Sequence, residues 1–225
     1  TLMLLDLIAT NEWERPIYFN NTSLATIGID LTNHVVMEGL TYRLLPIKKP
    51  DNQEELVNTE VAYANVTKEF SFRGMDNPHN YFDDQYRRFT SNHRSTLYTI
   101  SNALMNEGEM DRARDIQLLS LEKMPHEAIP YDLASGLSVS MLFELGLDEK
   151  ALDIIEKMSH KAVQLLDFYN RAGRPIDREA RISMEMLSNF VSVLWEKGYK
   201  MKAEKLQLHF DRIFGELGKQ RLPKR

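Results

Sequence analysis

The chain has 225 residues, of which 43% are hydrophobic and 27% charged, with a formal net charge of −5 and no cysteine. This composition is typical of a folded protein with one large or two small domains, and it excludes a fibrous or disordered chain. The lack of cysteine excludes disulfides, thiolate metal sites and cysteine nucleophiles, and no apolar run is long enough to span a bilayer.

Residues 1–56 are expected to form a small α/β segment with about two strands. A short apolar helix over 2–10 precedes a buried strand at 15–19. Residues 33–39 predict a short helix, and 41–47 predict a second strand. Strand, helix and strand in this order are compatible with parallel pairing of the two strands. The chain begins inside its first apolar helical pattern, which favours an excised fragment or a processed product over a natural start.

Residues 57–94 are expected to connect this segment to a helical domain. Asn58 and Thr59 are both suitable N-caps for a helix that follows the polar connection at 51–56. The tripeptide 76–78, Asp-Asn-Pro, is a turn signal. Asp83 is a residue type that caps helices, and it predicts the start of the next helix.

The remaining residues, 95–225, are expected to form an array of helical hairpins. The phrase Gly-x-x-x-x-Ala occurs at 108–113, 146–151 and 198–203, each time between two apolar helical patterns. A glycine there ends a helix because it can adopt the left-handed conformation, and the small alanine lets the next helix pack closely. The predicted fold class is therefore mainly α, and α+β overall.

The hairpins resemble tetratricopeptide repeats, which recur about every 34 residues. Here the three glycines are 38 and 52 residues apart, so the repeat is degenerate, and a generic helical bundle is the alternative. The longer interval is expected to hold an extended helix through 160–172. Gly173-Arg-Pro175 ends that helix, and Asp177 caps the next one.

Charge is distributed unevenly along the chain. Residues 1–170 carry 15 Lys and Arg against 26 Asp and Glu, whereas residues 171–225 carry 13 against 7. The basic end at 219–225 is of a kind that contacts anionic lipid or nucleic acid. It lacks the interleaved aromatic residues of a nucleic-acid platform, and we therefore expect no nucleic-acid partner.

The sequence lacks the motifs of common catalytic sites. It has no Gly-rich phosphate loop, no G-x-S-x-G elbow and no H-E-x-x-H zinc helix. No two of its six histidines stand three or four residues apart, the spacing of a helical metal pair. We predict no enzymatic activity for this chain, no cofactor and no metal site.

An aromatic and charged group around the helix start at Asp83 is the candidate ligand site. The acidic pair 83–84 and the arginine pair 87–88 predict either an anion site or simple ion pairs one helical turn apart. Tyr81, Tyr86 and Trp13 are side chains that stack on sugar rings or pack in a core. The predicted ligand-binding residues are Trp13, Tyr81, Asp83, Tyr86, Arg87 and Arg88.

Four phrases, at 11–19 (NEWERPIYF), 37–46 (MEGLTYRLLP), 57–59 (VNT) and 74–88, together resemble one protein family. They are similar to the soluble C-terminal region of uncharacterised bacterial multi-pass membrane proteins related to protein O-mannosyltransferases. The resemblance covers almost the whole chain. It implies a periplasmic location, on the extracytoplasmic face of a bacterial inner membrane, and membrane association through an N-terminal part that this chain lacks. In such families the membrane half uses a lipid-linked sugar donor, and no catalytic residue transfers to this sequence.

Two functions of different classes follow from these observations. The leading one is a non-catalytic interaction module of a membrane glycosyltransferase-like protein, in which helical repeats recruit a polypeptide or organise a complex. Its partner is then a polypeptide or its own membrane domain. The alternative is a carbohydrate-binding accessory domain that presents an acceptor or a lipid-linked sugar to the membrane half. The missing motifs disfavour a third possibility, an independent hydrolase.

Overall fold

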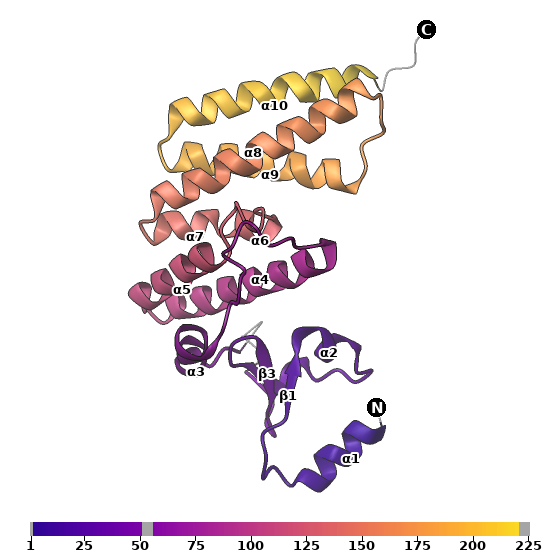
Figure 1. The fold of residues 1–225 in the computed structure, drawn as a ribbon, viewed down its shortest axis with the longest axis vertical. Helices are drawn as coiled ribbons and strands as arrows, with labels where there is room; N and C mark the ends of the chain where they lie inside the picture. The colour runs from indigo at the N-terminus through magenta and orange to yellow at the C-terminus, as the bar shows by residue number, and fades with distance from the viewer. Residues whose placement is uncertain (1, 51–55, 221–225) are drawn as a thin grey trace. The chain divides into compact units, whose positions relative to one another are not determined.

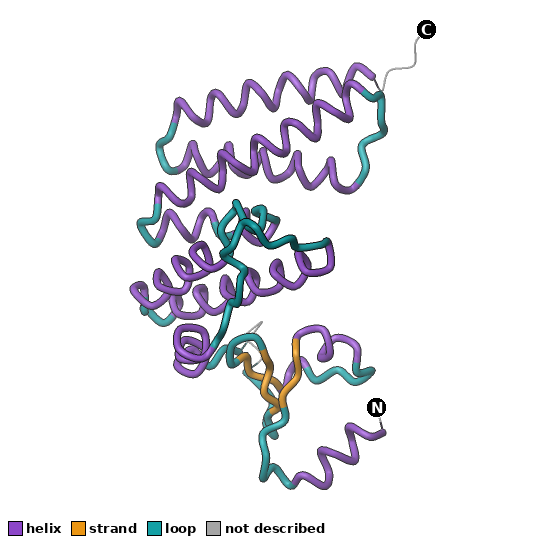
Figure 2. The backbone as a smooth tube through the Cα atoms, in the orientation of Figure 1, coloured by secondary structure: helices purple, strands orange, loops and turns teal. Residues whose placement is uncertain are grey.

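The computed structural model describes residues 2–50 and 56–220, and the chain divides into two compact units, Thr1–Pro130 and Tyr131–Arg225. Strands occur in the first unit, and helices make up most of the described chain (Figures 1 and 2). The predicted class, mainly α with a small β-containing segment, is therefore confirmed.

The predicted boundaries after residues 56 and 94 both fall inside the first unit. Of the predicted polar connection, residues 51–55 lie outside the described part of the chain, as do residues 221–225 of the basic end. Among the described residues, none of the helices combines the length and the apolar character needed to span a membrane.

The first unit begins with a helix and a three-stranded sheet of strand order β1-β3-β2. Both strand pairs are antiparallel, with Phe19 opposite Tyr42 and Val36 opposite Arg43. The expected parallel pairing is therefore wrong, and the sheet has three strands rather than about two. In chain order the elements are α1 (Leu2–Asn11), β1 (Tyr18–Asn20), α2 (Asn21–Thr26), η1 (Thr32–His34), β2 (Val35–Met37) and β3 (Thr41–Leu44).

The strand that was not predicted is β2, and it occupies most of the segment for which a short helix was predicted. Only the 3-10 turn η1 is helical there, because the β-branched pair Val35 and Val36 is buried against the rest of the sheet. Gly39 closes the β2–β3 turn with φ +111°, and a Cβ at this position would lie 2.7 Å from a ring carbon of Phe70. Within the described ranges, parallel pairing is limited to an isolated bridge between Met37 and Val57.

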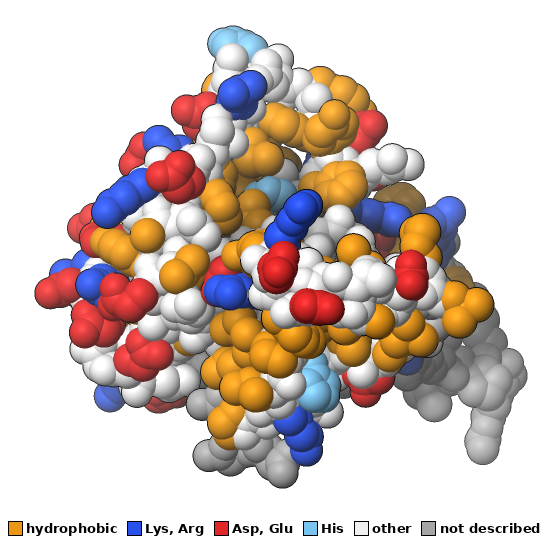
Figure 3. Space-filling model, turned by 90° about the horizontal axis from the view of Figure 1, so that it is seen from below, with side chains coloured by type: hydrophobic (Ala, Val, Ile, Leu, Met, Phe, Trp, Pro, Cys, Tyr) orange, Lys and Arg blue, Asp and Glu red, His pale blue; other side chains and the backbone are white. Residues whose placement is uncertain are grey.

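A small apolar core lies between the sheet and the helices next to it. Phe19, Val35 and Leu44 are buried, and Leu4 and Ile8 of α1 pack against them. The rest of α1 exposes large apolar side chains together with Asp6 and Thr10. Figure 3 shows one face of the molecule, with hydrophobic side chains gathered over part of it. The exposed large hydrophobic side chains of α1 are Leu2, Met3, Leu5 and Leu7.

The first unit continues with two pairs of helical elements: α3 (Thr59–Ala64) with the π-helical turn η2 (Asn65–Glu69), and α4 (Asp84–Asn106) with α5 (Met110–Lys123). Of the two predicted caps, Asn58 is the one that caps α3, since its side chain accepts the N–H of Val61. Helices α4 and α5 run side by side (Figure 1). Between them, the side-chain amide of Gln117 donates to the Ser101 hydroxyl over 2.9 Å, so the buried polar groups are paired.

Buried Arg94 of α4 holds the irregular segment that follows α5. Its guanidinium donates to the carbonyl oxygens of Met124, Ile129 and Pro130 at 2.9, 2.7 and 3.0 Å. Three main-chain carbonyls that lie outside a helix are thereby satisfied by a single side chain. The segment that ends the first unit is consequently fixed to α4.

The second unit consists of helices joined by short turns. In chain order they are α6 (Leu133–Leu137), α7 (Val139–Glu144), α8 (Asp148–Arg171), α9 (Arg178–Glu196) and α10 (Lys200–Gln220). Helices α8, α9 and α10 pack against one another (Figure 1). The extended helix predicted before Gly173 is confirmed as α8, and the predicted cap Asp177 accepts the N–H of Ala180 at 3.0 Å.

The apolar pattern before Gly146 forms two short helices, α6 and α7, with a break at Ser138. The segment contains one glycine and three serines within 135–140, and these residues weaken helix propagation. Gly136 allows α6 to approach α8 closely, since a Cβ there would lie 3.3 Å from the terminal methyl carbon of Met158.

All three Gly-x-x-x-x-Ala phrases form turns between helices. Gly108, Gly146 and Gly198 have φ values of +85°, +69° and +82°. At each, the glycine N–H and the next N–H bond back to carbonyls near the end of the preceding helix, the Schellman arrangement. The alanines at 113, 151 and 203 are fully buried. The predicted helix ends are therefore confirmed.

Candidate functional site

The second unit contains a groove bounded by the start of α6, the middle of α8 and the first half of α9, with a volume of about 520 Å³. We call it the α6–α9 groove. Its lining residues are Tyr131, Asp132, Leu133, Met158, Lys161, Ala162, Leu165, Asp177, Arg178, Glu179, Ile182, Ser183 and Met186.

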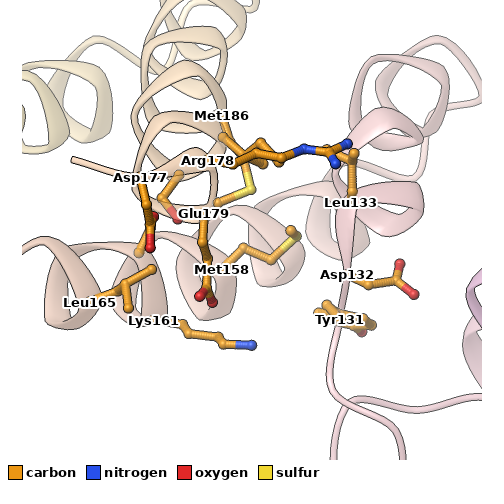
Figure 4. Close-up of a pocket in the computed structure, with 13 residues that line it drawn as sticks. Tyr131, Asp132, Leu133, Met158, Lys161, Leu165, Asp177, Arg178, Glu179 and Met186 are labelled. Atoms are coloured by element: carbon orange, nitrogen blue, oxygen red, sulfur yellow. The ribbon is translucent and has the colours of Figure 1, made fainter. Parts of the chain in front are cut away.

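The groove has an apolar floor and a charged rim. Met158 of α8 and Met186 of α9 lie in the floor, and Leu133 of α6, which is 51% exposed, forms one wall. Charges of both signs stand around it, and in Figure 4 the Arg178 side chain extends from α9 toward Leu133. The rim contains two cations, Lys161 and Arg178, and three carboxylates. The groove therefore does not select strongly for a ligand of one sign of charge.

One end of the groove is held in place by contacts of Tyr131. Its hydroxyl donates to a carboxylate oxygen of Asp153 over 3.2 Å, and Lys157 bonds to the same carboxylate over 3.0 Å. The Lys157 ammonium also lies 5.6 Å from the centre of the Tyr131 ring, a cation–π contact. This end of the groove is therefore formed before any ligand binds.

Asp177, at the other end, is held by two donors. The Tyr169 hydroxyl donates to one carboxylate oxygen, and the N–H of Ala180 donates to the other over 3.0 Å. The bond from Tyr169, followed by that from the main chain, lowers the pKa of the Asp177 carboxyl. The bond to Asp177, followed by burial, raises the pKa of the Tyr169 phenol. The carboxylate is thus ionised at neutral pH.

Both helix starts that border the groove carry their own aspartate caps. Asp132 accepts the N–H of Ser135 in a capping box at the start of α6. At the start of α9, Asp177 accepts the N–H of Ala180. These carboxylates occupy the N–H groups that an anion would otherwise use. The lining is therefore suited to apolar side chains, and its methionines can adapt to several shapes.

Five of the six predicted ligand-binding residues lie together at the start of α4. Asp83 caps this helix by accepting the N–H groups of Gln85 and Tyr86 at 3.0 and 2.9 Å. Tyr81 is 86% exposed and Tyr86 is 60% exposed.

The charged residues of this group form only weak contacts within the helix. Arg87 makes an exposed contact of 3.7 Å with Asp84 one turn away, and Arg88 is exposed. The predicted cap is confirmed. Sugar or anion binding by this group stays a prediction.

The sixth residue, Trp13, lies elsewhere in the first unit. It stands in the turn between α1 and β1 with φ +63° and is 44% exposed. Among the described residues, no contact joins Trp13 to the group at the start of α4. The structure therefore does not bring the six predicted residues into one site.

The α6–α9 groove was not predicted residue by residue. Asp177 was recognised as a helix cap, and the Pro130-Tyr-Asp132 turn carries a similar signal. The floor residues Met158 and Met186 are indistinguishable in sequence from ordinary core positions of their helices. Within the described part of the chain, no three His, Asp or Glu side chains are grouped so that they could hold a metal ion.

The comparisons with known proteins concern the N-terminal part of the chain. Residues 1–61 match the family model of TMEM260-associated domain 2. No curated protein and no solved structure matches the chain. The matched range contains three of the four phrases on which the family resemblance rests, at 11–19, 37–46 and 57–59. The chain is thus similar over about a quarter of its length to a domain linked to TMEM260, an O-mannosyltransferase-related membrane protein.

Proposed function

We propose that this chain is a non-catalytic interaction module of a membrane glycosyltransferase-like protein, and that its α6–α9 groove binds an extended polypeptide segment. The observation that carries the proposal is the groove itself. It has a preformed apolar floor, a rim of both charges and helix starts that are already capped. Such a surface suits an apolar side chain flanked by polar backbone.

The family match supports the biological setting of the proposal. It links the N-terminal residues to a membrane protein related to O-mannosyltransferases, and we place the module on the extracytoplasmic face of a bacterial inner membrane. The helix pairs joined by Gly-x-x-x-x-Ala turns are interpreted as degenerate tetratricopeptide-like repeats, which bind polypeptides on extended surfaces. The exposed large hydrophobic side chains of α1 are suited to contact with the protein's own membrane domain.

A matched pair of leucines in α6 provides the test. Leu133 lines the groove and is 51% exposed, whereas Leu137 in the same helix is 57% exposed and lies outside the lining. Peptides selected from a random displayed library against the whole chain are titrated into Leu133→Glu and Leu137→Glu variants. Because a leucine contact contributes about 1.5–3 kcal/mol, Leu133→Glu is expected to weaken binding at least about tenfold. Leu137→Glu is expected to change it less than about twofold.

The outcome distinguishes recruitment of a polypeptide from other roles. Peptides that bind both variants equally well, or a selection that yields no binder, would refute binding in this groove. Circular dichroism of both variants controls for folding, since each substitution replaces a half-exposed side chain.

The second candidate function is carbohydrate binding, which the exposure of Tyr81 and Tyr86 favours. Two accessible rings beside Arg87 are side chains suited to stack on a sugar and to bind its hydroxyl or phosphate groups. Sugars titrated into the chain are expected to change the amide chemical shifts of residues 81–88. In a Tyr81→Ala variant these shift changes are expected to be lost. Shifts absent from this segment would exclude the site.

A further inference from the structure

A second groove lies between α8 and α10, within the second unit, and has a volume of about 440 Å³. We call it the α8–α10 groove. It shares no lining residue with the α6–α9 groove. Its floor is apolar, with Ile155 and Val163 from α8 and Leu206 from α10. Its rim differs in charge from that of the first groove.

The rim of the α8–α10 groove is basic. Lys202 and Lys205 stand three residues apart on α10, a spacing that places both on one face of the helix, and both are exposed. His160 and His209 add two further nitrogen-bearing side chains, and the single carboxylate of the lining is Glu156. Two ammonium groups against one carboxylate favour a ligand with negative charge.

A buried hydroxyl in the same lining lacks a partner. Ser159 is 7% exposed, and its hydroxyl makes no hydrogen bond to any described residue. Among the side chains that the structure describes, it is the sole buried oxygen or nitrogen without a hydrogen-bond partner. An unpaired buried hydroxyl is costly, and native structures usually reserve such groups for a ligand or water. Ser159 lines the groove, and because its hydroxyl oxygen is itself buried, a change of side-chain rotamer brings it to an acceptor bound there.

We propose that the α8–α10 groove binds an amphipathic anion, a phosphate ester attached to an aliphatic chain. The phosphate head accepts hydrogen bonds from Lys202, Lys205 and Ser159, three donors that match its three terminal oxygens. The aliphatic chain covers Ile155 and Leu206 on the floor. A purely polar anion would leave this floor in water, and a neutral lipid would leave the lysines and the serine without acceptors.

The test compares three probes, each below its micelle concentration, on the whole chain by calorimetry and amide chemical shifts. Dodecyl phosphate is expected to bind with shifts in residues 155–163 and 202–209. Inorganic phosphate and neutral dodecyl maltoside are each expected to bind at least about tenfold more weakly, since each loses one of the two contributions. Equal binding of either control overturns the proposal. Tighter binding of an apolar peptide with a free C-terminal carboxylate would assign the groove to polypeptide ends and also overturn it.

Variants separate the site from general charge and from folding. Lys202→Gln/Lys205→Gln is expected to weaken dodecyl phosphate binding at least about tenfold. Lys200→Gln, an exposed lysine of α10 outside the lining, is expected to change it less than about twofold. If both variants bind alike, the basic rim plays no part and the proposal fails.

Ser159→Ala gives an independent readout of the hydroxyl. It is expected to weaken binding several-fold while leaving thermal stability unchanged or higher, because the unpaired hydroxyl is removed. Unchanged binding with lower stability would show that the serine serves the fold alone. Leu133→Glu is expected to leave dodecyl phosphate binding intact, which separates failure here from failure of polypeptide binding in the α6–α9 groove.

Discussion

Glu38 joins the sequence phrases that suggested the family resemblance. It is 4% exposed, and its carboxylate accepts the Tyr18 hydroxyl at 2.7 Å and the Asn58 amide at 3.2 Å. Arg43 lies 3.6 Å away. The hydrogen bond to Glu38 raises the pKa of the Tyr18 phenol. Since these residues come from three of the phrases, at least part of their shared pattern reflects folding of the sheet rather than chemistry.

Glu38→Gln is expected to destabilise the first unit by about 1–3 kcal/mol, because charge-assisted bonds to a buried acceptor become weaker neutral ones. The chain has two tryptophans, Trp13 in the first unit and Trp195 in the second. In a Trp195→Phe background, urea unfolding followed by Trp13 fluorescence reports on the first unit. Tyr18→Phe, which removes a half-exposed hydrogen-bond donor, is expected to destabilise the first unit less than Glu38→Gln does. A midpoint unchanged by Glu38→Gln would contradict the structural role of this carboxylate.

Asp177 is expected to make the stability of the second unit depend on pH. Its pKa is lowered in the folded state, so its contribution is fully present above the unfolded value of about 3.9. The contribution is lost as the pH falls through the lower folded pKa. Asp177→Asn keeps a capping side chain but removes the charge. The variant is expected to be less stable than the parent at pH 7, and this difference in stability is expected to shrink toward pH 2. Urea midpoints from Trp195 in a Trp13→Phe background measure the difference. A deficit independent of pH would exclude the ionised carboxylate as its source.

At the scale of elements, the Gly-x-x-x-x-Ala turns combine a backbone requirement with a packing requirement. A Cβ at Gly108 or Gly198 would meet no atom within 4 Å. These glycines are therefore required by their positive φ and not by lack of space. The alanines, in contrast, are fully buried and are required by close packing. A turn of this kind needs a residue that tolerates positive φ and, five residues later, a small residue that can be buried. These two needs explain why Gly-x-x-x-x-Ala recurs.

Two glycines of the second unit give a matched prediction. Gly198→Ala is expected to cost about 1–2 kcal/mol, the penalty for an L-residue in the left-handed region. Gly215→Ala, inside α10 and also without an atom within 4 Å, is expected to stabilise by roughly 0.5–1 kcal/mol through helix propensity. Thermal unfolding of the two variants measures both signs. Equal effects would show that the conformation of Gly198 is unimportant.

For the whole molecule, charge is the property that separates the two proposed ligands. The chain carries a net charge of −5, which repels anions at long range. The lysines of the α8–α10 groove act locally in the opposite sense, whereas the α6–α9 groove has charges of both signs. The salt dependence of binding therefore shows whether a ligand responds to the net negative charge of the whole chain or to the local positive charge of the α8–α10 groove.

Raising salt from about 50 to about 500 mM is expected to weaken dodecyl phosphate binding several-fold, because the lysine contacts are screened. Binding of peptides to the α6–α9 groove is expected to change less than about twofold. Calorimetric titrations at both salt concentrations provide the comparison. Anion binding that strengthens with salt would mean that repulsion by the whole chain outweighs attraction by the groove.

The sequence by itself determined the local features of this protein. Helix ends at Gly108, Gly146 and Gly198, and caps at Asp83 and Asp177, follow from the conformational range of one residue or from bonds to N–H groups two or three residues away. The spacing of apolar residues likewise identified the helices that begin or end at these glycines and caps.

Only the tertiary structure decided the sheet and the grooves. Strands of three or four residues have too little periodicity to show their direction or partners, so the antiparallel order and the strand at Val35–Met37 were missed. The Glu38 network, the methionine floor of the α6–α9 groove and the unpaired Ser159 hydroxyl each depend on elements distant in the chain. Such contacts leave no local pattern, because they are set by which faces of separate helices and strands pack together.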